Sequence, residues 1–485
     1  MSRRRDTGRR AIGAAAAAAA VVACAFAASV GATDFGANDD TGKYSADGGA
    51  AFYTNMTGLG LKQTVITVRW APTDLLAVAE QTLLDLTVPL ATAAGLDVVF
   101  ATYPYPPRDI EAGFASAEGF GEWLAQLARR YPQVRQFVVG NEPNQPAFFR
   151  PQFVRGKQAS AALFGQFLAA GYDALKGVDP TIKVIGVGLS PRGNDRPNAR
   201  SNISTSPVRF LAALGRWYRR TGRELPLMDG FSYHPYPNRA TDSLMKGYQW
   251  PSAGFANLDR IKQALWDAFN GTAQPTTVEG LKLYLDEVGW QVETEGIVGY
   301  VGAENVAVTT ETHQATVYRE LVAQAQCDPD IAEVNIFGFY DDAQLAGFQA
   351  GLNRVDGTPR PSAQAVQEAI AAGCVTGQRT WTPARGVVGA KRPRVARTGG
   401  ALRVTLAARE GALARVCVLP GMRSDASTRR ALADVSAEGC TKAKVMPGTP
   451  VVINMPQATG RATVAVQLVA EANPTRRLVT SQRLP

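Results

Sequence analysis

The stretch that decides the fold runs from Val138 to Gln145 and reads Val-Val-Gly-Asn-Glu-Pro-Asn-Gln. A short apolar run that begins at Phe137 stops at Gly140, and polar turn residues follow at once. An apolar run bounded by turn residues predicts a buried strand. In a parallel barrel, the residues just past the C-terminal end of a strand line the active site. We therefore expect Asn141 and Glu142 to face such a site.

A second stretch of the same kind, Leu283 to Trp290, reads Leu-Tyr-Leu-Asp-Glu-Val-Gly-Trp and carries Glu287 at its end. Two glutamates at two strand ends are the pair that hydrolysis of a glycosidic bond requires. One carboxyl protonates the leaving oxygen while the other attacks the anomeric carbon. The pattern predicts that Glu142 and Glu287 meet at one mouth of a barrel.

Between and around these stretches, apolar runs alternate with segments of helical spacing. Eight such repeats over about 340 residues predict an α/β fold, the (β/α)8 or TIM barrel. The expected strands are 34–38, 65–70, 98–103, 137–139, 182–187, 230–235, one carrying Glu287, and 334–339. The expected helices are 50–59, 80–94, 120–131, 164–175, 206–218, 258–269, 314–326 and 363–370.

Three strand-to-helix connections are long, at 238–256, 291–309 and 341–361. Loops of this length are uncommon in a compact domain unless they serve a function. We expect these loops to rise on the face that carries both glutamates. Their aromatic residues would then form the walls of a sugar pocket: Tyr248, Trp250, Tyr300 and Phe348.

The charge is unevenly distributed along the 485 residues, whose net charge is +9. From Thr376 to the end there are 18 Lys and Arg residues against 5 Asp and Glu residues. The body between the N-terminal arginine cluster and Thr376 is therefore negative. A negative body suits a cleft that carries carboxylates, and it argues against a nucleic-acid partner.

The tail from residue 376 to 485 has a different character from the expected catalytic domain at 33–375. A Gly-, Pro- and Arg-rich stretch, 386–398, precedes short alternating runs at 402–406, 415–418, 451–453 and 462–468. Strand periodicity punctuated by turns predicts a small β-sandwich. Two roles are open for it: adhesion of its basic surface to an anionic cell-wall polymer, or bracing of the barrel.

Residues 1–32 combine a basic start, an Ala-rich apolar run and small-residue cleavage patterns at 25–27 and 30–32. These features predict a signal peptide and a secreted or wall-associated protein. A retained membrane anchor is the alternative, because the apolar run is nearly long enough to span a bilayer. The segment 21–24 also resembles a lipoprotein box that ends at Cys24, and the arginine pairs hint at twin-arginine export.

Four cysteines remain after removal of such a signal, an even number in an exported protein, and this predicts disulfides. The expected pairs are Cys327–Cys374, between the C-terminal ends of two neighbouring helices, and Cys417–Cys440, within the small domain. The alternative is four buried thiols.

The motifs Asn141-Glu142-Pro143 at the fourth strand and Asp286–Trp290 at the seventh resemble those of clan-A glycoside hydrolases, the 4/7 superfamily of retaining β/α-barrel enzymes. The resemblance covers roughly residues 33–372. It implies that Glu142 is the general acid/base and Glu287 the nucleophile. It also implies a poly- or oligosaccharide substrate, with no cofactor and no metal.

The resemblance further implies roles for two polar residues near the glutamates. Asn141 would hold the 2-hydroxyl of the sugar. Arg69, at the end of the second strand, matches the arginine beside the nucleophile in that family. A nearby cation would keep this carboxylate ionised.

Two residues at the sixth strand, His234 and Tyr236, resemble the family's His-x-Tyr pair, in which the tyrosine hydrogen-bonds the nucleophile. Trp290 or Tyr103 would stack against a sugar face, although either residue can equally serve packing. The family often places a tryptophan at the end of the eighth strand. This chain has Phe339-Tyr340 there instead.

Each assignment has a structural alternative. Glu142 can be a solvated turn residue, Glu287 an ion-pair partner of Arg69, and His234 a core histidine. For the whole protein, the alternatives are a non-catalytic carbohydrate-binding or wall-associated barrel and a transglycosylase with the same site. Other chemistries are disfavoured, because the sequence contains no His-Glu-x-x-His, Gly-x-Ser-x-Gly or P-loop motif.

Overall fold

The computed structural model describes residues 33–485, except for 75, 384–392, 409–411, 435–439, 446–449, 457–459, 471–476 and 485. The predicted signal peptide, 1–32, lies outside the described residues. No helix in the described ranges is long and apolar enough to cross a membrane.

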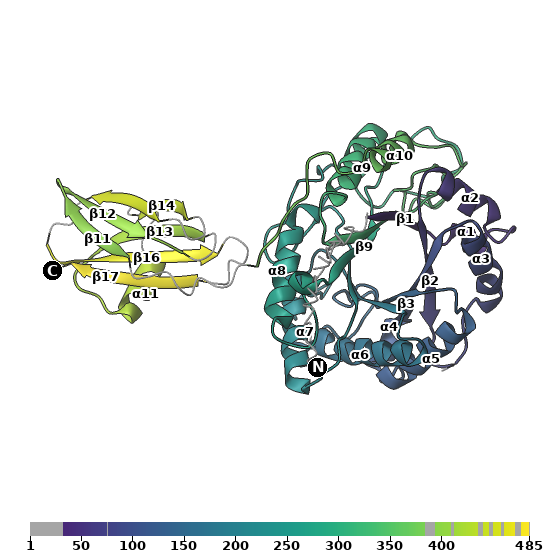
Figure 1. Ribbon diagram of the computed structural model, residues 1–485, viewed down its shortest axis with the longest axis horizontal. Coiled ribbons are helices and arrows are strands. Elements are labelled where there is room, and N and C mark those ends of the chain that lie inside the picture. Colours follow the sequence, from purple (N-terminus) through teal and green to yellow (C-terminus); the bar gives the residue numbers. More distant parts are fainter. Residues whose placement is uncertain are drawn as a thin grey trace, which may run out of the picture. The chain divides into compact units, whose positions relative to one another are not determined.

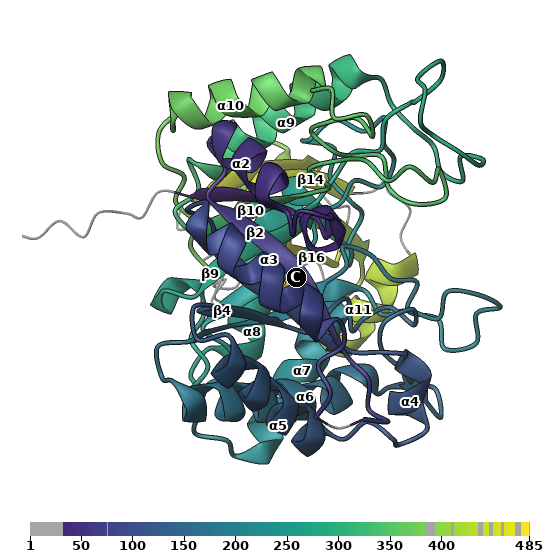
Figure 2. The same ribbon diagram turned by 90° about the vertical axis from the view of Figure 1, so that its right-hand side faces the viewer.

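Eight parallel strands close into a barrel, and helices form a ring around it (Figures 1 and 2). Around the barrel the strands follow the order β1 (Asp34–Asn38), β10 (Ile331–Phe337), β9 (Lys282–Val288), β8 (Gly230–Tyr233), β7 (Lys183–Leu189), β4 (Gln136–Val139), β3 (Asp97–Pro104) and β2 (Gln63–Trp70). The predicted TIM barrel is confirmed.

The connecting elements also follow the predicted alternation. The helices are α1 (Thr41–Tyr44), α2 (Ala50–Gly58), α3 (Gln81–Ala93), α4 (Pro107–Glu111), α5 (Ala117–Arg130), α6 (Ser160–Val178), α7 (Pro207–Thr221), α8 (Leu258–Phe269), α9 (Glu311–Ala325) and α10 (Pro361–Ala372). A small hairpin, β5 (Phe153–Val154) and β6 (Lys157–Gln158), precedes α6, and the 3₁₀ turns η1 (Phe255–Asn257) and η2 (Thr277–Glu279) flank α8.

The strands are apolar on both faces, because each strand packs inward on the barrel core and outward on the helices. In β2, Val65 belongs to the small interior cluster, whereas Ile66 and Val68 belong to the large cluster shared with the helices. Residues next to each other in a strand point to opposite faces. This is why near-continuous apolar runs marked the strands in the sequence.

The long connections all follow the C-terminal ends of strands, and several project on the right-hand side of Figure 2. The three long loops that we predicted lead to α8, α9 and α10. Two further long connections, 140–159 after β4 and 190–206 after β7, were not singled out from the sequence. Because parallel strands end on one face of the barrel, these five loops build its rim.

The tail forms two antiparallel sheets, as predicted. One sheet pairs β11 (Arg394–Thr398), β12 (Ala401–Leu406) and β15 (Val451–Pro456), and the other pairs β14 (Cys440–Val445), β13 (Ala412–Pro420), β16 (Ala462–Ala470) and β17 (Arg477–Leu484). They share one apolar core and are accompanied by α11 (Asp425–Asp434). The four predicted runs became β12, β13, β15 and β16. The edge strand β11 is largely exposed, so it carries no apolar alternation, and the sequence analysis assigned it to the Gly-, Pro- and Arg-rich stretch.

Both predicted disulfides are present, Cys327–Cys374 and Cys417–Cys440. The first follows the C-terminal ends of α9 and α10, and the second joins residues that face each other in β13 and β14. Each bond therefore lies inside one of the two folded parts.

We expect the double variant Cys327→Ser/Cys374→Ser to lower the free energy of unfolding of the barrel by about 4 kcal/mol, because the unfolded chain regains the entropy of the loop that the bond closes. Six of the seven tryptophans lie within residues 33–375 and none lies beyond Trp381, so their fluorescence during denaturation reports mainly the barrel. Cys417→Ser/Cys440→Ser is the matched control and should leave this transition in place. Equal shifts in the two double variants would contradict the assignment of one bond to each part.

Candidate active site

The backbone places Glu142 by a tight turn immediately after β4. Gly140 has φ of +108°, and a Cβ there would lie 2.5 Å from the ring of Phe164, so glycine is required. Glu142 itself has φ of +39°, and its N–H donates to the carbonyl of Gly188 at 2.7 Å. A non-glycine residue at positive φ persists only when its surroundings hold it there.

Asn144 stabilises the backbone conformation of this turn. Its side chain is completely buried, and its amide links the turn to the loop that follows β7. Oδ1 accepts from the N–H of Ser190 at 3.0 Å, while Nδ2 donates to the carbonyls of Ser190 and Thr205 at 3.1 and 2.9 Å. The position of Glu142 thus depends on two barrel loops.

Glu287 lies in β9, and its carboxylate accepts a hydrogen bond from the hydroxyl of Tyr236 at 3.1 Å. Tyr236 is itself fixed, because its carbonyl accepts from the hydroxyl of Tyr248. The pKa of Glu287 is raised to about 7. Burial is the main cause, the carboxylates of Glu142 and Asp286 also raise this pKa, and His234 lowers it.

His234 joins the two glutamates. Its ring is completely buried, and Nδ1 lies 3.3 Å from Oε1 of Glu142 and 3.5 Å from Oε2 of Glu287. On the other side of the ring, Nε2 lies 3.4 Å from Oδ1 of Asp286, which also accepts from the hydroxyl of Ser232. Both glutamate oxygens contact the same Nδ1 atom. The distance between these two oxygens therefore cannot exceed the sum of their distances to Nδ1.

The imidazole is surrounded by acids on both edges. Burial alone would lower the pKa of His234, but the carboxylates of Glu287, Asp286 and Glu142 outweigh burial and hold this pKa well above its ordinary value. The surrounding carboxylates therefore favour the charged form of the ring. This form offsets part of the negative charge that the three carboxylates bring together.

Two cavities open over this cluster. Glu287, Asn141 and Arg69 line a cavity of about 660 Å³, whereas Glu142 and Tyr236 line a neighbouring one of about 480 Å³. Phe348, from the loop after β10, lines both cavities and packs edge-on against Tyr236 and Phe337. The two glutamates thus face two halves of one divided cleft.

Arg69 differs in its contacts from the sequence expectation. Its Nε donates to the hydroxyl of Tyr103 at 3.0 Å, and its guanidinium lies over the ring of Tyr105. Among the described residues it forms no ion pair with Glu287, whose contacting cation is His234. Asn141 and Tyr103 line the same cavity as Arg69, so all three remain within reach of a ligand there.

Trp290, expected at the sugar face, lies instead in the core. Its indole is only 1% exposed, packs edge-on against Tyr318, and donates through Nε1 to the carbonyl of Asp242 at 2.8 Å. A side chain with so little exposed surface serves packing. At the eighth strand, Phe339 is also buried, whereas Phe337 and Tyr340 line the cavity of Glu287.

The sequence analysis missed several polar residues at the site. Asp39 and Asp40 follow β1 directly and line the Glu287 cavity. The rule that strand ends face the site, applied to the first strand, would have found them. Ser232 and Asp286 gave no such signal, because they lie within strands. Asp286 contacts Nε2 of His234, and Ser232 donates to Asp286.

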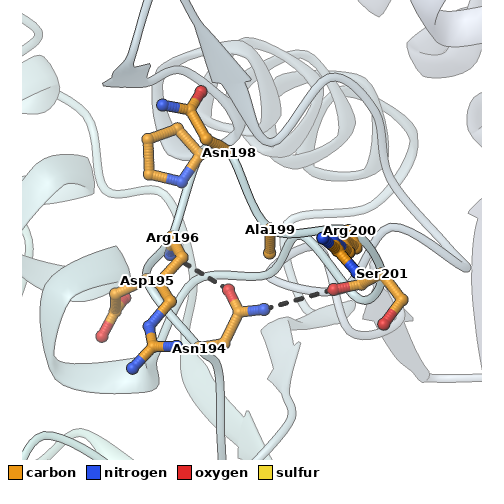
Figure 3. A pocket seen from close by; sticks show the side chains of 8 residues that line it. Asn194, Asp195, Arg196, Asn198, Ala199, Arg200 and Ser201 are labelled. Carbon is orange, nitrogen blue, oxygen red and sulfur yellow. Dashed lines mark hydrogen bonds between the residues drawn. The ribbon is translucent and has the colours of Figure 1, made fainter.

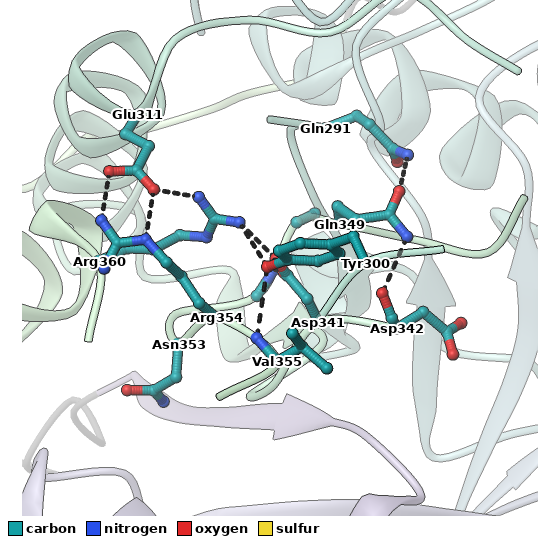
Figure 4. Close-up of polar contacts among 12 residues, drawn as sticks. Gln291, Tyr300, Glu311, Asp341, Asp342, Gln349, Asn353, Arg354, Val355 and Arg360 are labelled. Atoms are coloured by element: carbon teal, nitrogen blue, oxygen red, sulfur yellow. Dashed lines mark hydrogen bonds and ion pairs between the residues drawn. The ribbon is translucent and has the colours of Figure 1, made fainter. Parts of the chain in front are cut away.

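A buried ionic network fastens the loops that carry the walls of the cleft (Figure 4). The guanidinium of Arg360 is completely buried and pairs with Glu311 at the start of α9 and with Asp341 after β10. The hydroxyl of Tyr300, from the loop after β9, donates to the same carboxylate of Asp341. The loops after β9 and β10 are thereby tied together beside Phe348.

No protein-family model matches the sequence, and no curated protein matches it. Among solved structures, the chain is similar to a family 39 glycoside hydrolase from Bacteroides cellulosilyticus WH2, with 14% identity and a TM-score of 0.47 over 88% of this chain and 81% of that chain. It is similar to a GH5_18 protein from Streptomyces cattleya, solved in complex with GlcNAc, with 16% identity and a TM-score of 0.49 over 72% and 82% of the two chains. Native xylanase 10B from Thermotoga maritima shows 12% identity and a TM-score of 0.45 over 71% and 96%. At these identities the likeness is one of fold alone.

Proposed function

We propose that the protein is a retaining glycoside hydrolase, with Glu142 as general acid/base and Glu287 as nucleophile. The contact of both carboxylates with one imidazole nitrogen carries the proposal, because it limits their separation. Retaining enzymes hold their two carboxyls about 5–5.5 Å apart, and inverting enzymes about 6.5–9.5 Å apart. The shared contact favours the shorter spacing.

The reaction would proceed in two displacements. Glu287 attacks the anomeric carbon while Glu142 gives its proton to the leaving oxygen, so that a glycosyl ester forms on Glu287 as the glycosidic bond breaks. Glu142, now ionised, then removes a proton from water, which displaces Glu287 from the sugar. Each step leaves the carboxyls in the state that the next step requires.

His234 and Tyr236 would act as positioning residues for this pair. The hydroxyl of Tyr236 and the imidazolium of His234 both contact Oε2 of Glu287, and both favour its ionised form. The ring also contacts Glu142, so it fixes the spacing of the two acids. Asn141, in the Glu287 cavity, is suitably placed to hold a sugar hydroxyl.

Export of the enzyme belongs to the same proposal. Two disulfides suit a protein that folds in an oxidising compartment. The substrate would then be a poly- or oligosaccharide outside the cell, and the basic C-terminal domain is a candidate for contact with an anionic wall polymer.

We expect Glu142→Gln and Glu287→Gln to retain the fold and to lose activity by about 10²-fold or more, since general acid–base catalysis alone contributes about 10²–10⁴-fold. Azide should rescue the corresponding alanine variants by different routes. At Glu287→Ala it replaces the nucleophile and gives the azide of inverted configuration, and at Glu142→Ala it intercepts the glycosyl enzyme and gives the retained one.

Product configuration followed by NMR during turnover of aryl glycosides provides the readout. Glu320→Gln, an exposed carboxylate on α9, is the control for loss of one charge and should remain fully active. An inverted anomer from the unaltered enzyme would contradict the mechanism. An inert wild type would favour a carbohydrate-binding protein, and transfer to added sugars in place of water would identify a transglycosylase.

We expect kcat/KM to rise with pH through an apparent pKa near 7, because burial raises the pKa of Glu287 to about 7 and the nucleophile must be ionised. His234→Asn removes the cation that lowers this pKa. The acidic limb of the profile should therefore move to higher pH. Tyr236→Phe, which removes a single hydrogen bond, should move it in the same direction by less. A limb that stays in place in both variants would show that another group controls it.

A further inference from the structure

The two cavities of the cleft differ sharply in charge. The cavity of Glu287 is also lined by Asp39, Asp40, Asp341 and Asp342, and Arg69 is the one cation among its lining residues. Two of these acids have partners outside the lining, because Asp40 pairs with Lys43 and Asp341 with Arg360. In the cavity of Glu142, that glutamate is the only acid among the lining residues, while Arg192 and Arg239 also line it. One half of the cleft is therefore acidic and the other basic.

The guanidinium groups of the basic half face no carboxylate partner among the described residues, and that of Arg192 contacts the hydroxyl of Tyr248. Arg192 follows β7 and Arg239 follows β8, and both side chains are exposed. In the part of the chain that the structure describes, neither forms an ion pair with a carboxylate. Gln145, Asn202 and Gln291 line the same cavity, where Nε2 of Gln145 donates to the carbonyl of Arg192 and Nε2 of Gln291 donates to Gln349.

The basic character continues outward along the loop after β7. This loop curls around a hollow of about 580 Å³ that Arg196 and Arg200 line (Figure 3). The side-chain amide of Asn194 stabilises the loop, because it accepts from the N–H of Arg196 at 3.0 Å and donates to the carbonyl of Ser201. Arg200 also lines an adjoining hollow with Arg150 and Asn202. Asn202 lines the Glu142 cavity as well, so these arginines continue outward from the acid/base, although Asp195 lines the first hollow and Glu111 the second.

The roles of the two glutamates set the direction of the substrate. The nucleophile lies beneath the sugar that becomes covalently bound, and the acid faces the group that departs. The acidic half would thus hold the sugar that is transferred, and the basic half would hold the leaving group. This orientation rests on the proposed function.

We propose that the Glu142 half of the cleft binds an anionic sugar, one that carries a carboxylate, sulfate or phosphate group, as the leaving-group part of the substrate. Guanidinium forks match the geometry of such anions and form charge-assisted hydrogen bonds with them. In the other half, Glu287 and Asp342 have no paired Lys or Arg among the described residues, so they would accept hydrogen bonds from hydroxyls and repel an anion. The substrate is therefore an acidic glycan from which a neutral sugar is released.

The first test compares aryl glycosides that share one neutral sugar and differ in the leaving phenol, which bears a meta-carboxylate or the uncharged meta-carboxamide. The wild type should prefer the carboxylate. Arg192→Gln/Arg239→Gln should reduce kcat/KM for the carboxylate about tenfold or more, with little change for the amide, since hydrogen bonds to charged groups contribute at least this factor. Arg220→Gln, an exposed arginine on α7, is the charge-matched control. An unchanged ratio in the double variant would overturn the proposal.

The second test needs no turnover. Calorimetric titration of Glu142→Gln with uronate-, sulfate- and phosphate-bearing oligosaccharides, and with the neutral oligosaccharide, identifies which anion is bound. Affinity should be lost when Arg192→Gln/Arg239→Gln is added. Selective binding without any turnover of the wild type would contradict the proposed hydrolysis and support the anionic subsite. Turnover of neutral and charged glycosides at equal rates, with unselective binding, would support the proposed hydrolysis and contradict the anionic subsite.

Discussion

The contact between one buried imidazolium and three carboxylates is the interaction on which the rest of the site depends. Three acids so close together, and so poorly hydrated, would repel one another and bind protons. His234 contacts all three acids and lowers the pKa of Glu287, against the burial and the neighbouring carboxylates that raise it. The acids in turn raise the pKa of His234 and so favour its charged form. Neither partner would be stable in this state alone.

The barrel explains how these groups meet. Glu142, His234 and Glu287 come from, or just follow, β4, β8 and β9, and parallel strands bring such positions to one face. Beneath them the interior is filled by apolar side chains from several strands, which form a firm base. The loops above are secured by Asn144 on one side and by the Arg360 network on the other. Fixed strands and tethered loops together limit how far the reacting groups can shift.

Short-range patterns predicted the barrel and the meeting of Glu142 and Glu287. The cysteine pairs were predicted from the elements that carry them, and the resemblance to a family implied the places of His234 and Tyr236. Apolar runs mark strands, and the residue after a strand must face the rim. Trp290 was misjudged for the same reason, since the chain turns it into the core after β9, and sequence spacing does not reveal that turn. The contact of Arg69 with Tyr103 and the division of the cleft by Phe348 depend on side chains from distant loops. No local pattern encodes such pairings.

The ring of Phe348 also has a kinetic consequence. Because it lines the hollows of both glutamates, the departing chain and the retained sugar of the proposed reaction would occupy compartments that empty at different times. The hydrolytic water must then come through the compartment that the departing chain has just vacated. A polyanion that dissociates slowly from the arginines would keep this water out and could reattack the retained sugar. The ionic strength of the medium would thereby influence how often a cleaved bond is remade.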